Sequence, residues 1–207
     1  MASDWLREAL EESRTRGFLG PGPIDPQIQH AEGFILSWHG LKESAPGRLL
    51  DLGSGGGIPG LVLAERWRSP AVFLDSVALR TAFLRQVLGR PGAPAQVEIV
   101  TGRAESLARQ PGLEGTFDLV VARSFGPPAV TAECAARFAA VGGLMIVSEP
   151  PESNPEIRWP AEPLEALGWR LGAAVRHGSA YQILEKVGDT PLEYPRAVGR
   201  PGKRPLF

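Results

Sequence analysis

The feature that most constrains the fold is the stretch of residues 48–60, RLLDLGSGGGIPG, in which an apolar run leads into a cluster of glycines. An apolar run, a glycine cluster and a following helical pattern indicate a buried strand, a tight turn and a helix. Residues 55–60 also satisfy Gly-x-Gly-x-x-Gly, the pattern that places a pyrophosphate at a helix N-terminus. That pattern alone is weak, and glycine-rich turns also serve purely as packing devices. The turn therefore indicates a nucleotide-sized ligand, with a dinucleotide site and a structural turn as the alternatives.

An acidic residue lies two positions before the first glycine of this turn. The order Asp51-x-Gly53-x-Gly55-x-Gly57 after an apolar run resembles the first motif of class I S-adenosylmethionine (AdoMet) methyltransferases. The resemblance implies that the glycines let the backbone approach the amino-acid end of the cofactor, and that the acid helps to organise the turn. It favours AdoMet over a dinucleotide.

Short apolar runs alternate with helical patterns along most of the chain. Strands are expected at residues 48–52, 71–75, 97–101, 117–122, 143–148, 169–176 and 180–187. Helices are expected at residues 4–16, 27–38, 59–68, 77–89, 103–110, 128–140 and 161–167, with a Gly/Pro-rich loop at 17–26. Repeated strand–helix alternation predicts a parallel sheet with helices on both faces. The last two strands share a link of three residues, 177–179, and are therefore expected to be antiparallel neighbours.

The expected fold class is α/β, a Rossmann-like class I AdoMet-dependent methyltransferase with a mostly parallel seven-stranded sheet and an antiparallel C-terminal strand pair. We expect one structural domain overall. It comprises an N-terminal helical extension (residues 1–46), an AdoMet-binding domain (47–190) and a basic C-terminal tail (191–207).

Polar residues at the strand ends are the candidates for ligand binding, because ligands of open α/β sheets lie outside the carboxyl ends of the strands. Asp75 ends the second strand 24 residues after Asp51. An acid at this spacing can accept hydrogen bonds from a ribose diol, and the alternative is a helix N-cap. Glu105, after the third strand, is expected either to meet adenine or to be a first-turn helix acid. Arg123 ends the fourth strand and is expected either to lie over cofactor and acceptor or to form a surface salt bridge.

Four segments, residues 50–60, 74–84, 102–105 and 117–124, together resemble the RsmG (GidB) family. That family methylates N7 of a guanosine in 16S (small-subunit) ribosomal RNA with AdoMet, so the resemblance implies this activity and a 16S rRNA or 30S subunit partner. Arg123 is the candidate near the acceptor, and Asp75 is expected on the ribose. The cofactor-binding residues expected are Asp51, Gly53, Gly55, Gly57, Ile58, Asp75, Ala104, Glu105 and Arg123.

The sequence departs from the family at two places. His30 is followed by Ala-Glu-Gly-Phe where the family has His-x-x-Asp-Ser, and no Asn-Leu-Thr segment is present near the N-terminus. Residues 148–151, Ser-Glu-Pro-Pro, replace the family's Lys-Gly after the fifth strand, so that Glu149 stands where a cation is usual. The cofactor assignment therefore carries over better than the rRNA assignment. The alternatives are a methyltransferase acting on a small molecule or another RNA, and a non-catalytic AdoMet- or ribosome-binding protein.

The C-terminal tail supplies candidate cations for RNA phosphates, because a stretch with alternating Pro, Gly and Arg is expected to be extended and accessible. The alternative is a tail packed on the domain. The candidate RNA-binding residues are Arg196, Arg200, Lys203 and Arg204.

The overall composition excludes few classes of function. The formal net charge of −1 does not indicate a nucleic acid or membrane partner, so any basic surface must be local. The single cysteine excludes an internal disulfide and is typical of a reducing compartment. No signal-peptide pattern, membrane-spanning run or Cys/His metal spacing is visible. We expect a cytoplasmic protein without a metal or membrane partner, with a monomer favoured.

Overall fold

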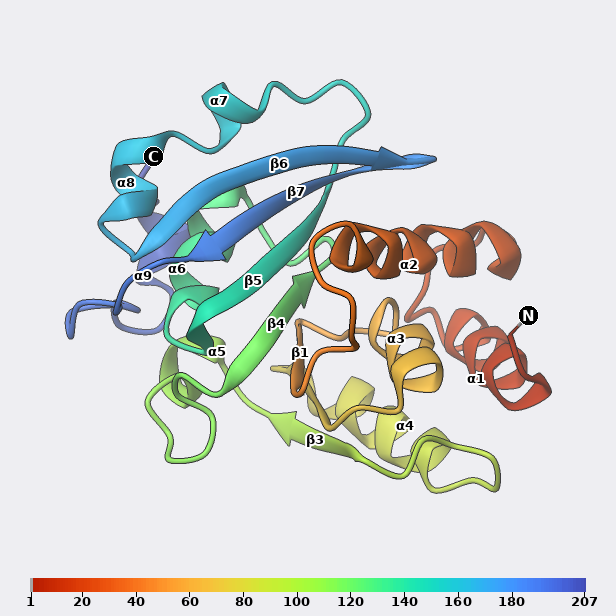
Figure 1. The fold of residues 1–207 in the computed structure, drawn as a ribbon. Helices are drawn as coiled ribbons and strands as arrows, with labels where there is room; N and C mark the ends of the chain where they lie inside the picture. Colours follow the sequence, from red (N-terminus) through yellow and green to blue (C-terminus); the bar gives the residue numbers. More distant parts are fainter. Residues whose placement is uncertain (1) are drawn as a thin grey trace.

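The computed structural model describes residues 2–207, and within them seven strands form one sheet in the order β3-β2-β1-β4-β5-β7-β6 (Figure 1). β1 to β5 pair in parallel, and β7 is antiparallel to both of its neighbours, β5 and β6. The expected fold class is therefore confirmed. The strands are β1 (Leu49–Leu52), β2 (Ala71–Asp75), β3 (Val97–Thr101), β4 (Phe117–Ala122), β5 (Ala139–Glu149), β6 (Trp169–His177) and β7 (Ser179–Lys186).

Successive side chains of a strand point to opposite faces of the sheet, so apolar strands give the sheet two apolar faces. Helices cover both faces and bury two core clusters. In β1, Leu49 enters the core cluster on one face and Leu50 enters the cluster on the other. The helices are α1 (Asp4–Thr15), α2 (Ile24–His39), α3 (Gly60–Trp67), α4 (Ala78–Leu88), α5 (Ala104–Leu107), α6 (Pro128–Ala136), α7 (Pro155–Arg158), α8 (Ala161–Glu165) and α9 (Arg200–Lys203).

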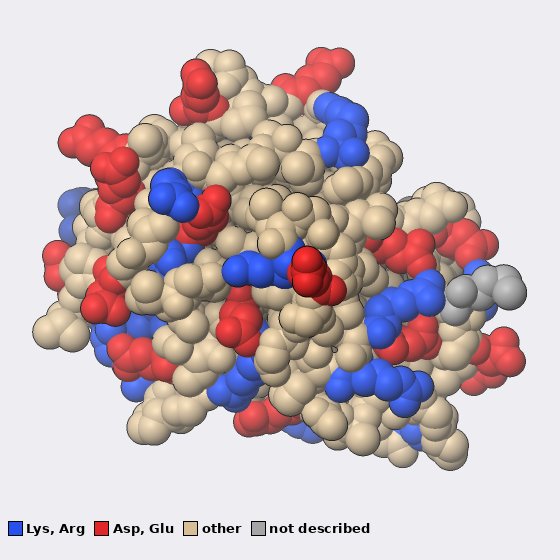
Figure 2. All heavy atoms as spheres, viewed as in Figure 1, with Lys and Arg blue, Asp and Glu red and all other residues tan. Residues whose placement is uncertain are grey.

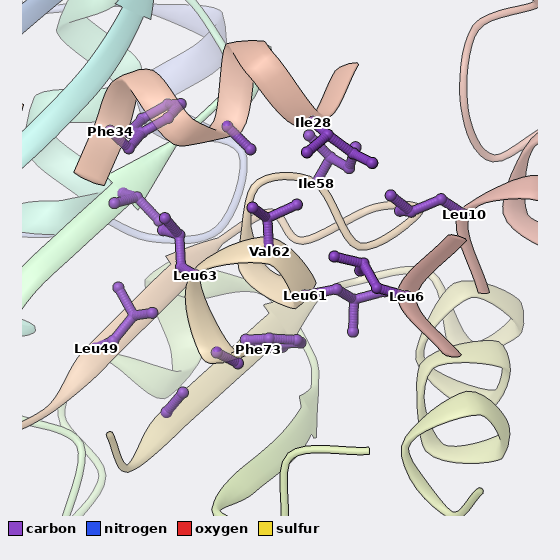
Figure 3. Packing of buried hydrophobic residues seen from close by; sticks show 14 of the residues in the cluster. Leu6, Leu10, Ile28, Phe34, Leu49, Ile58, Leu61, Val62, Leu63 and Phe73 are labelled. Carbon is purple, nitrogen blue, oxygen red and sulfur yellow. The ribbon is translucent and has the colours of Figure 1, made fainter. Parts of the chain in front are cut away.

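The N-terminal helices share a core with the sheet. α1 begins where the Ser3 hydroxyl accepts a hydrogen bond from the Leu6 N–H at 3.2 Å, which is an N-cap contact. Figure 3 shows leucine, isoleucine and phenylalanine side chains of α1 and α2 packing over α3 and β1. The residues labelled there are Leu6, Leu10, Ile28, Phe34, Leu49, Ile58, Leu61, Val62, Leu63 and Phe73. The two helices that precede β1 are thus packed with α3 in the core on one face of the sheet.

Several element boundaries differ from those expected. α2 begins at Ile24 rather than residue 27, because the missing N–H of Pro26 costs nothing in the first turn of a helix. α6 ends at Ala136, and β5 already begins at Ala139 instead of 143. The early part of β5 is separated from the rest by a register shift, because Phe117 pairs with Ala139 but Leu119 pairs with Leu144. Within this stretch, a Cβ on Gly143 would lie 2.9 Å from the Phe117 carbonyl oxygen.

Positively and negatively charged side chains do not form separate patches on the face of the molecule that Figure 2 shows. Over the face drawn in Figure 2, lysine and arginine side chains are interspersed with aspartate and glutamate. Among residues 2–207, no helix has the length and apolar character needed to cross a membrane.

Candidate cofactor and acceptor site

The turn between β1 and α3 exposes backbone rather than side chains. Gly53, Gly55 and Gly57 have φ angles of 76°, 53° and 99°, in the left-handed region that favours glycine. A Cβ on Gly53 would lie 2.6 Å from a ring carbon of Phe125. The Gly55 N–H donates to the Asp75 carboxylate at 2.9 Å, which ties the turn to the end of β2. The turn therefore forms a cradle of backbone groups, and a side chain at Gly53 would collide with Phe125.

Asp51 supports this turn from within the core. It is fully buried, and its Oδ2 accepts a hydrogen bond from the Gly60 N–H at 2.9 Å while Oδ1 has no hydrogen-bond partner. Burial raises the pKa of Asp51 to about 7, against the opposing effect of the Gly60 hydrogen bond. Asp51 and Gly57, both expected as cofactor contacts, line none of the three pockets described below. Their places in the structure are those of supports beneath the cradle.

A first pocket, here called the Glu105 pocket, has a volume of about 190 Å³ beside the cradle. It brings together strand-end residues that the sequence singled out, including Asp75, Ala104 and Glu105. Its lining is Gly53, Leu74, Asp75, Ser76, Arg80, Gly102, Arg103, Ala104, Glu105, Ser124, Phe125, Val130 and Cys134.

The Asp75 carboxylate accepts hydrogen bonds from two backbone N–H groups, while the N-cap of α4 is Val77. Asp75 Oδ1 accepts a hydrogen bond from the Val77 N–H at 2.8 Å, at the start of α4, and its Oδ2 accepts from the cradle. A carboxylate has about four acceptor positions, so these two bonds leave capacity for a diol in the Glu105 pocket. Arg80 lies 3.7 Å away and lines the same pocket.

Glu105 links the pocket to the C-terminal segment. Its Oε1 accepts hydrogen bonds from the Arg103 guanidinium at 2.9 Å and from the Gly199 N–H at 3.0 Å. Burial alone would raise the pKa of Glu105, but these hydrogen bonds outweigh it and hold the pKa below its ordinary value. The carboxylate is therefore ionised at neutral pH and positioned by a residue 94 positions further along the chain.

A second pocket, the Gly55 pocket, lies over the cradle and has a volume of about 310 Å³. One wall comes from the loop before α2 and from α2 itself, segments that the sequence marked only as loop and helix. The Ser13 hydroxyl donates to the Gly56 carbonyl at 2.7 Å and holds α1 against the turn. The lining is Phe18, Leu19, Gly20, Gln27, Gly53, Ser54, Gly55, Gly56, Ile58, Arg80, Arg123 and Ser124.

The third pocket, the Glu149 pocket, lies at the ends of β4 and β5 and has a volume of about 380 Å³. Burial, with a smaller effect of Arg123, lowers the pKa of His30 to about 4, so this imidazole is neutral at pH 7. Glu149, 5% exposed in its side chain, pairs with Arg158. The lining is His30, Arg123, Ser124, Phe125, Gly126, Pro128, Val147, Ser148, Glu149, Pro150, Arg158 and Trp159.

The three pockets meet at the end of β4. Ser124 lines all of them and has a positive φ of 54°, a strained conformation for a residue other than glycine. Arg123 lines both the Gly55 pocket and the Glu149 pocket, and its guanidinium donates to Gln27 Oε1 at 2.5 Å. Arg123 is thus held by α2 and is not the surface salt bridge considered as its alternative. One molecule can occupy the first two pockets while another enters the third.

The C-terminal segment is packed rather than extended. Arg196 forms an ion pair with Glu133, which is fully buried, and its backbone N–H donates to the same carboxylate at 2.8 Å. Arg109 and Arg137 donate hydrogen bonds to backbone carbonyls of residues 190–195. The expectation of an accessible tail is therefore wrong for Arg196, whose charge is neutralised by Glu133. Exposed cations remain at the chain end: Arg200, Lys203 and Arg204.

Within the described part of the chain, no three His, Cys, Asp or Glu side chains gather in a way that could hold a metal ion. The cysteine near the Glu105 pocket, Cys134, has its pKa raised by burial, which keeps the thiol protonated.

Solved structures similar to this one include methyltransferase folds. The chain aligns with S-adenosylhomocysteine-bound methyltransferase PaMTH1 of Podospora anserina with a TM-score of 0.58 and 16% identity, over 90% of this chain and 89% of that one. It aligns with a mutant of MtNAS in complex with S-adenosylmethionine with a TM-score of 0.61 and 13% identity, over 88% and 73%. At these identities the likeness concerns the fold.

Sequence comparison is more specific. The family "rRNA small subunit methyltransferase G" matches residues 30–166. The ribosomal RNA small subunit methyltransferase G of Moorella thermoacetica is 33% identical over 86% of this chain and 77% of that protein. The protein of the same name from Dehalococcoides mccartyi strain CBDB1 is 32% identical over 88% and 80%. The chain therefore belongs to the rRNA small subunit methyltransferase G family.

Proposed function

We propose that this protein transfers the methyl group of AdoMet to N7 of a guanosine in small-subunit ribosomal RNA. The observation that carries the proposal is the junction at Ser124, where two pockets beside the glycine cradle open onto a third. A methyl donor and a methyl acceptor need adjacent sites that meet at one point, since holding two reactants in line is the main catalytic device available here. Family membership supports the substrate class.

The first two pockets fit AdoMet. Gly53 lines both pockets, so the backbone of the turn borders the space that AdoMet would occupy. The Gly55 pocket offers backbone groups for the amino-acid end, and Asp75 and Glu105 offer carboxylates for the ribose and the adenine amino group. When bound, AdoMet supplies an electrophilic methyl group.

The third pocket would take the acceptor. Guanine N7 carries an in-plane lone pair and no proton, so the protein needs to orient the base rather than deprotonate it. The lining residues fit this requirement, because His30 is neutral and Arg123 is a permanent cation held by Gln27. We propose that Arg123 orients the acceptor at the junction.

The test is methylation of defined substrates. Purified protein is incubated with radiolabelled AdoMet and either intact 30S subunits or naked 16S rRNA, and the RNA is digested to nucleosides. We expect label in 7-methylguanosine, and a second portion of the same RNA, cut into oligonucleotides instead, should carry the label at one position. The Gly53→Val variant serves as the control for background incorporation.

The alternatives give different results. Label in another nucleoside would assign a different RNA reaction, whereas AdoMet binding without any incorporation would indicate a small-molecule acceptor or a binding protein. Either result overturns the proposal.

A further inference from the structure

The carboxylate at the end of β5 is held in a fixed position in the acceptor pocket. Glu149 Oε2 accepts a hydrogen bond from Arg158 Nε at 2.5 Å, and Oε1 accepts from Trp159 Nε1 at 3.1 Å. Trp159 is 1% exposed, and the side chain of Glu149 is 5% exposed. A carboxylate with two directional donors on separate oxygens has little freedom to rotate, so its remaining lone pairs point in fixed directions.

This carboxylate retains capacity for a ligand. A carboxylate offers about four acceptor positions, and the contacts from Arg158 and Trp159 occupy two of them. Among the described residues that line the Glu149 pocket, it is the only carboxylate. An ionised carboxylate accepts hydrogen bonds and cannot donate them, so the group selects a ligand that presents donors.

Guanine matches this requirement better than the other RNA bases. Its Watson–Crick edge presents two adjacent donors, N1–H and the 2-amino group, whereas adenine, cytosine and uracil present at most one donor beside acceptors. Protein carboxylates can therefore read this edge with two parallel hydrogen bonds. We infer that Glu149 is the residue that selects guanine, by accepting hydrogen bonds from N1–H and the 2-amino group of the acceptor base; this inference rests on the proposed function.

The same contact favours the reaction. N7 lies on the imidazole side of guanine, away from the Watson–Crick edge, so a base held by Glu149 keeps N7 free. Methylation at N7 places positive charge on the base and makes N1–H a stronger donor. The hydrogen bond to an anionic acceptor therefore strengthens as the reaction proceeds, and an interaction that strengthens in this way raises the rate of the chemical step.

Arg158 and Trp159 act through Glu149 and are positioning residues. The short helix α7 and the residue after it place both donors on the carboxylate, which explains why residues 150–160 fold back over the end of β5. The Ser-Glu-Pro-Pro sequence at 148–151 is thus part of one recognition unit with Arg158 and Trp159.

The experiment compares guanosine with inosine, which lacks only the 2-amino group. Once the methylated position is known from the labelling assay, 16S rRNA carrying either nucleoside there is assembled into 30S subunits. Wild-type protein is expected to prefer guanosine over inosine by about 10- to 100-fold in kcat/KM, the range for losing one charge-assisted hydrogen bond. In Glu149→Gln, which keeps the side-chain volume, the preference is expected to collapse to about twofold or less.

Controls separate recognition from folding. Glu152→Gln removes an exposed acid from the same loop and should keep the wild-type preference. Glu149→Asp keeps the charge for Arg158 and should show an intermediate preference, so it replaces Glu149→Gln if that variant does not fold. Calorimetric AdoMet titration and thermal melting on the same samples verify that the cofactor pockets are intact.

The outcomes are distinct. Wild-type protein that methylates guanosine and inosine equally, or a Glu149→Gln variant with the wild-type preference, overturns the role of Glu149 but leaves the proposed function standing. Wild-type protein that methylates no guanosine in either RNA overturns both.

Discussion

The two halves of the site are built in different ways. Around β1, β2 and β3 the ligand surface is mostly backbone, set by glycines with positive φ and by carboxylates that bond to their own turns. Around β4 and β5 the surface is made of side chains that other side chains hold in place, such as Arg123 held by Gln27 and Glu149 held by Trp159.

This difference separates the part of the site that the fold determines from the part that single substitutions can change. A backbone cradle tolerates little change, since any Cβ at Gly53 meets Phe125. A wall of side chains can be altered residue by residue without moving a strand. The segments that carry the resemblance to the family lie mostly in the cofactor half, whereas Glu149, the departure noted from the sequence, lies in the acceptor half.

The largest expected effect comes from filling the cradle. Gly53→Val puts a branched side chain at a φ of 76° and against Phe125, and should weaken AdoMet binding by about 100-fold or more. Isothermal titration calorimetry measures the change. Gly112→Val is the matched control, because Gly112 has a φ of 83° but open space around it, so it carries the backbone strain without entering the site. Equal loss of binding in both variants would show that strain, not the cradle, is responsible.

The next effect tests the acceptor half through its packing. A Cβ on Gly33 of α2 would lie 2.0 Å from the Tyr181 hydroxyl, which donates to the His30 carbonyl at 2.6 Å. Gly33→Ala should lower the free energy of unfolding by about 1 to 3 kcal/mol, the usual range for overpacking. It should reduce RNA methylation more than AdoMet affinity, because Gly33 lies one turn from His30, which lines the Glu149 pocket. Urea unfolding and the two activity readouts measure this.

Gly40→Ala is the control at the C-cap of the same helix, because a Cβ there meets only atoms at 3.5 Å, which is ordinary contact. If Gly33→Ala reduced AdoMet affinity as much as methylation, the two halves would not be separable.

A smaller effect concerns the buried acid under the cradle. Burial raises the pKa of Asp51 from 3.8 to about 7 in the folded protein. Below pH 3.8 the carboxyl group is protonated in both the folded and the unfolded state, and it has no effect on the free energy of unfolding. Between pH 3.8 and 7 it ionises only in the unfolded state, which stabilises that state increasingly as the pH rises. The stability of wild type relative to Asp51→Asn should therefore fall by about 1 kcal/mol per pH unit between these values. Unfolding by urea at pH 4.5, 5.5, 6.5 and 7.5 measures the slope; a difference that does not vary with pH would contradict it.

The smallest effect is expected at the chain end. Replacing Arg200, Lys203 and Arg204 with Gln should weaken RNA binding a few-fold at moderate salt and should lower the slope of log affinity against log salt by about 2. Filter binding across a salt series measures this. Arg196→Gln is the contrast, because it removes the partner of buried Glu133 and should lower thermal stability without changing the salt slope. A salt slope unaffected by the triple change would remove these cations from the RNA interface.

The same division explains how far the sequence could predict the site. The glycine turn, Asp75 and residues 102–105 are signalled locally, because a turn or a strand end requires those residue types within a few positions. The wall made by residues 18–20 and Gln27 has no local signal, since Gln27 meets Arg123 across 96 positions.

The tail illustrates the limit most clearly. Arg196 and Arg200 look alike in the sequence, and both belong to a stretch of alternating Pro, Gly and Arg. What distinguishes them is Glu133, which lies 63 positions before Arg196 in a helix whose apolar pattern gives no reason to expect a charged partner. Pairing of a buried acid is decided by tertiary packing, so composition alone could not reveal which cations stay exposed.

The hydrogen bond from Gly199 to Glu105 also bears on the order in which the protein can mature. The Glu105 carboxylate emerges from the ribosome 94 residues before the Gly199 N–H that positions it. The buried Glu133 emerges 63 residues before its partner Arg196. Until residues 196–199 have left the exit tunnel, the nascent chain has a glycine cradle but lacks one support of the neighbouring pocket. We therefore expect the Glu105 pocket to reach its final shape only late in synthesis, after the strands that carry the cradle have already been made.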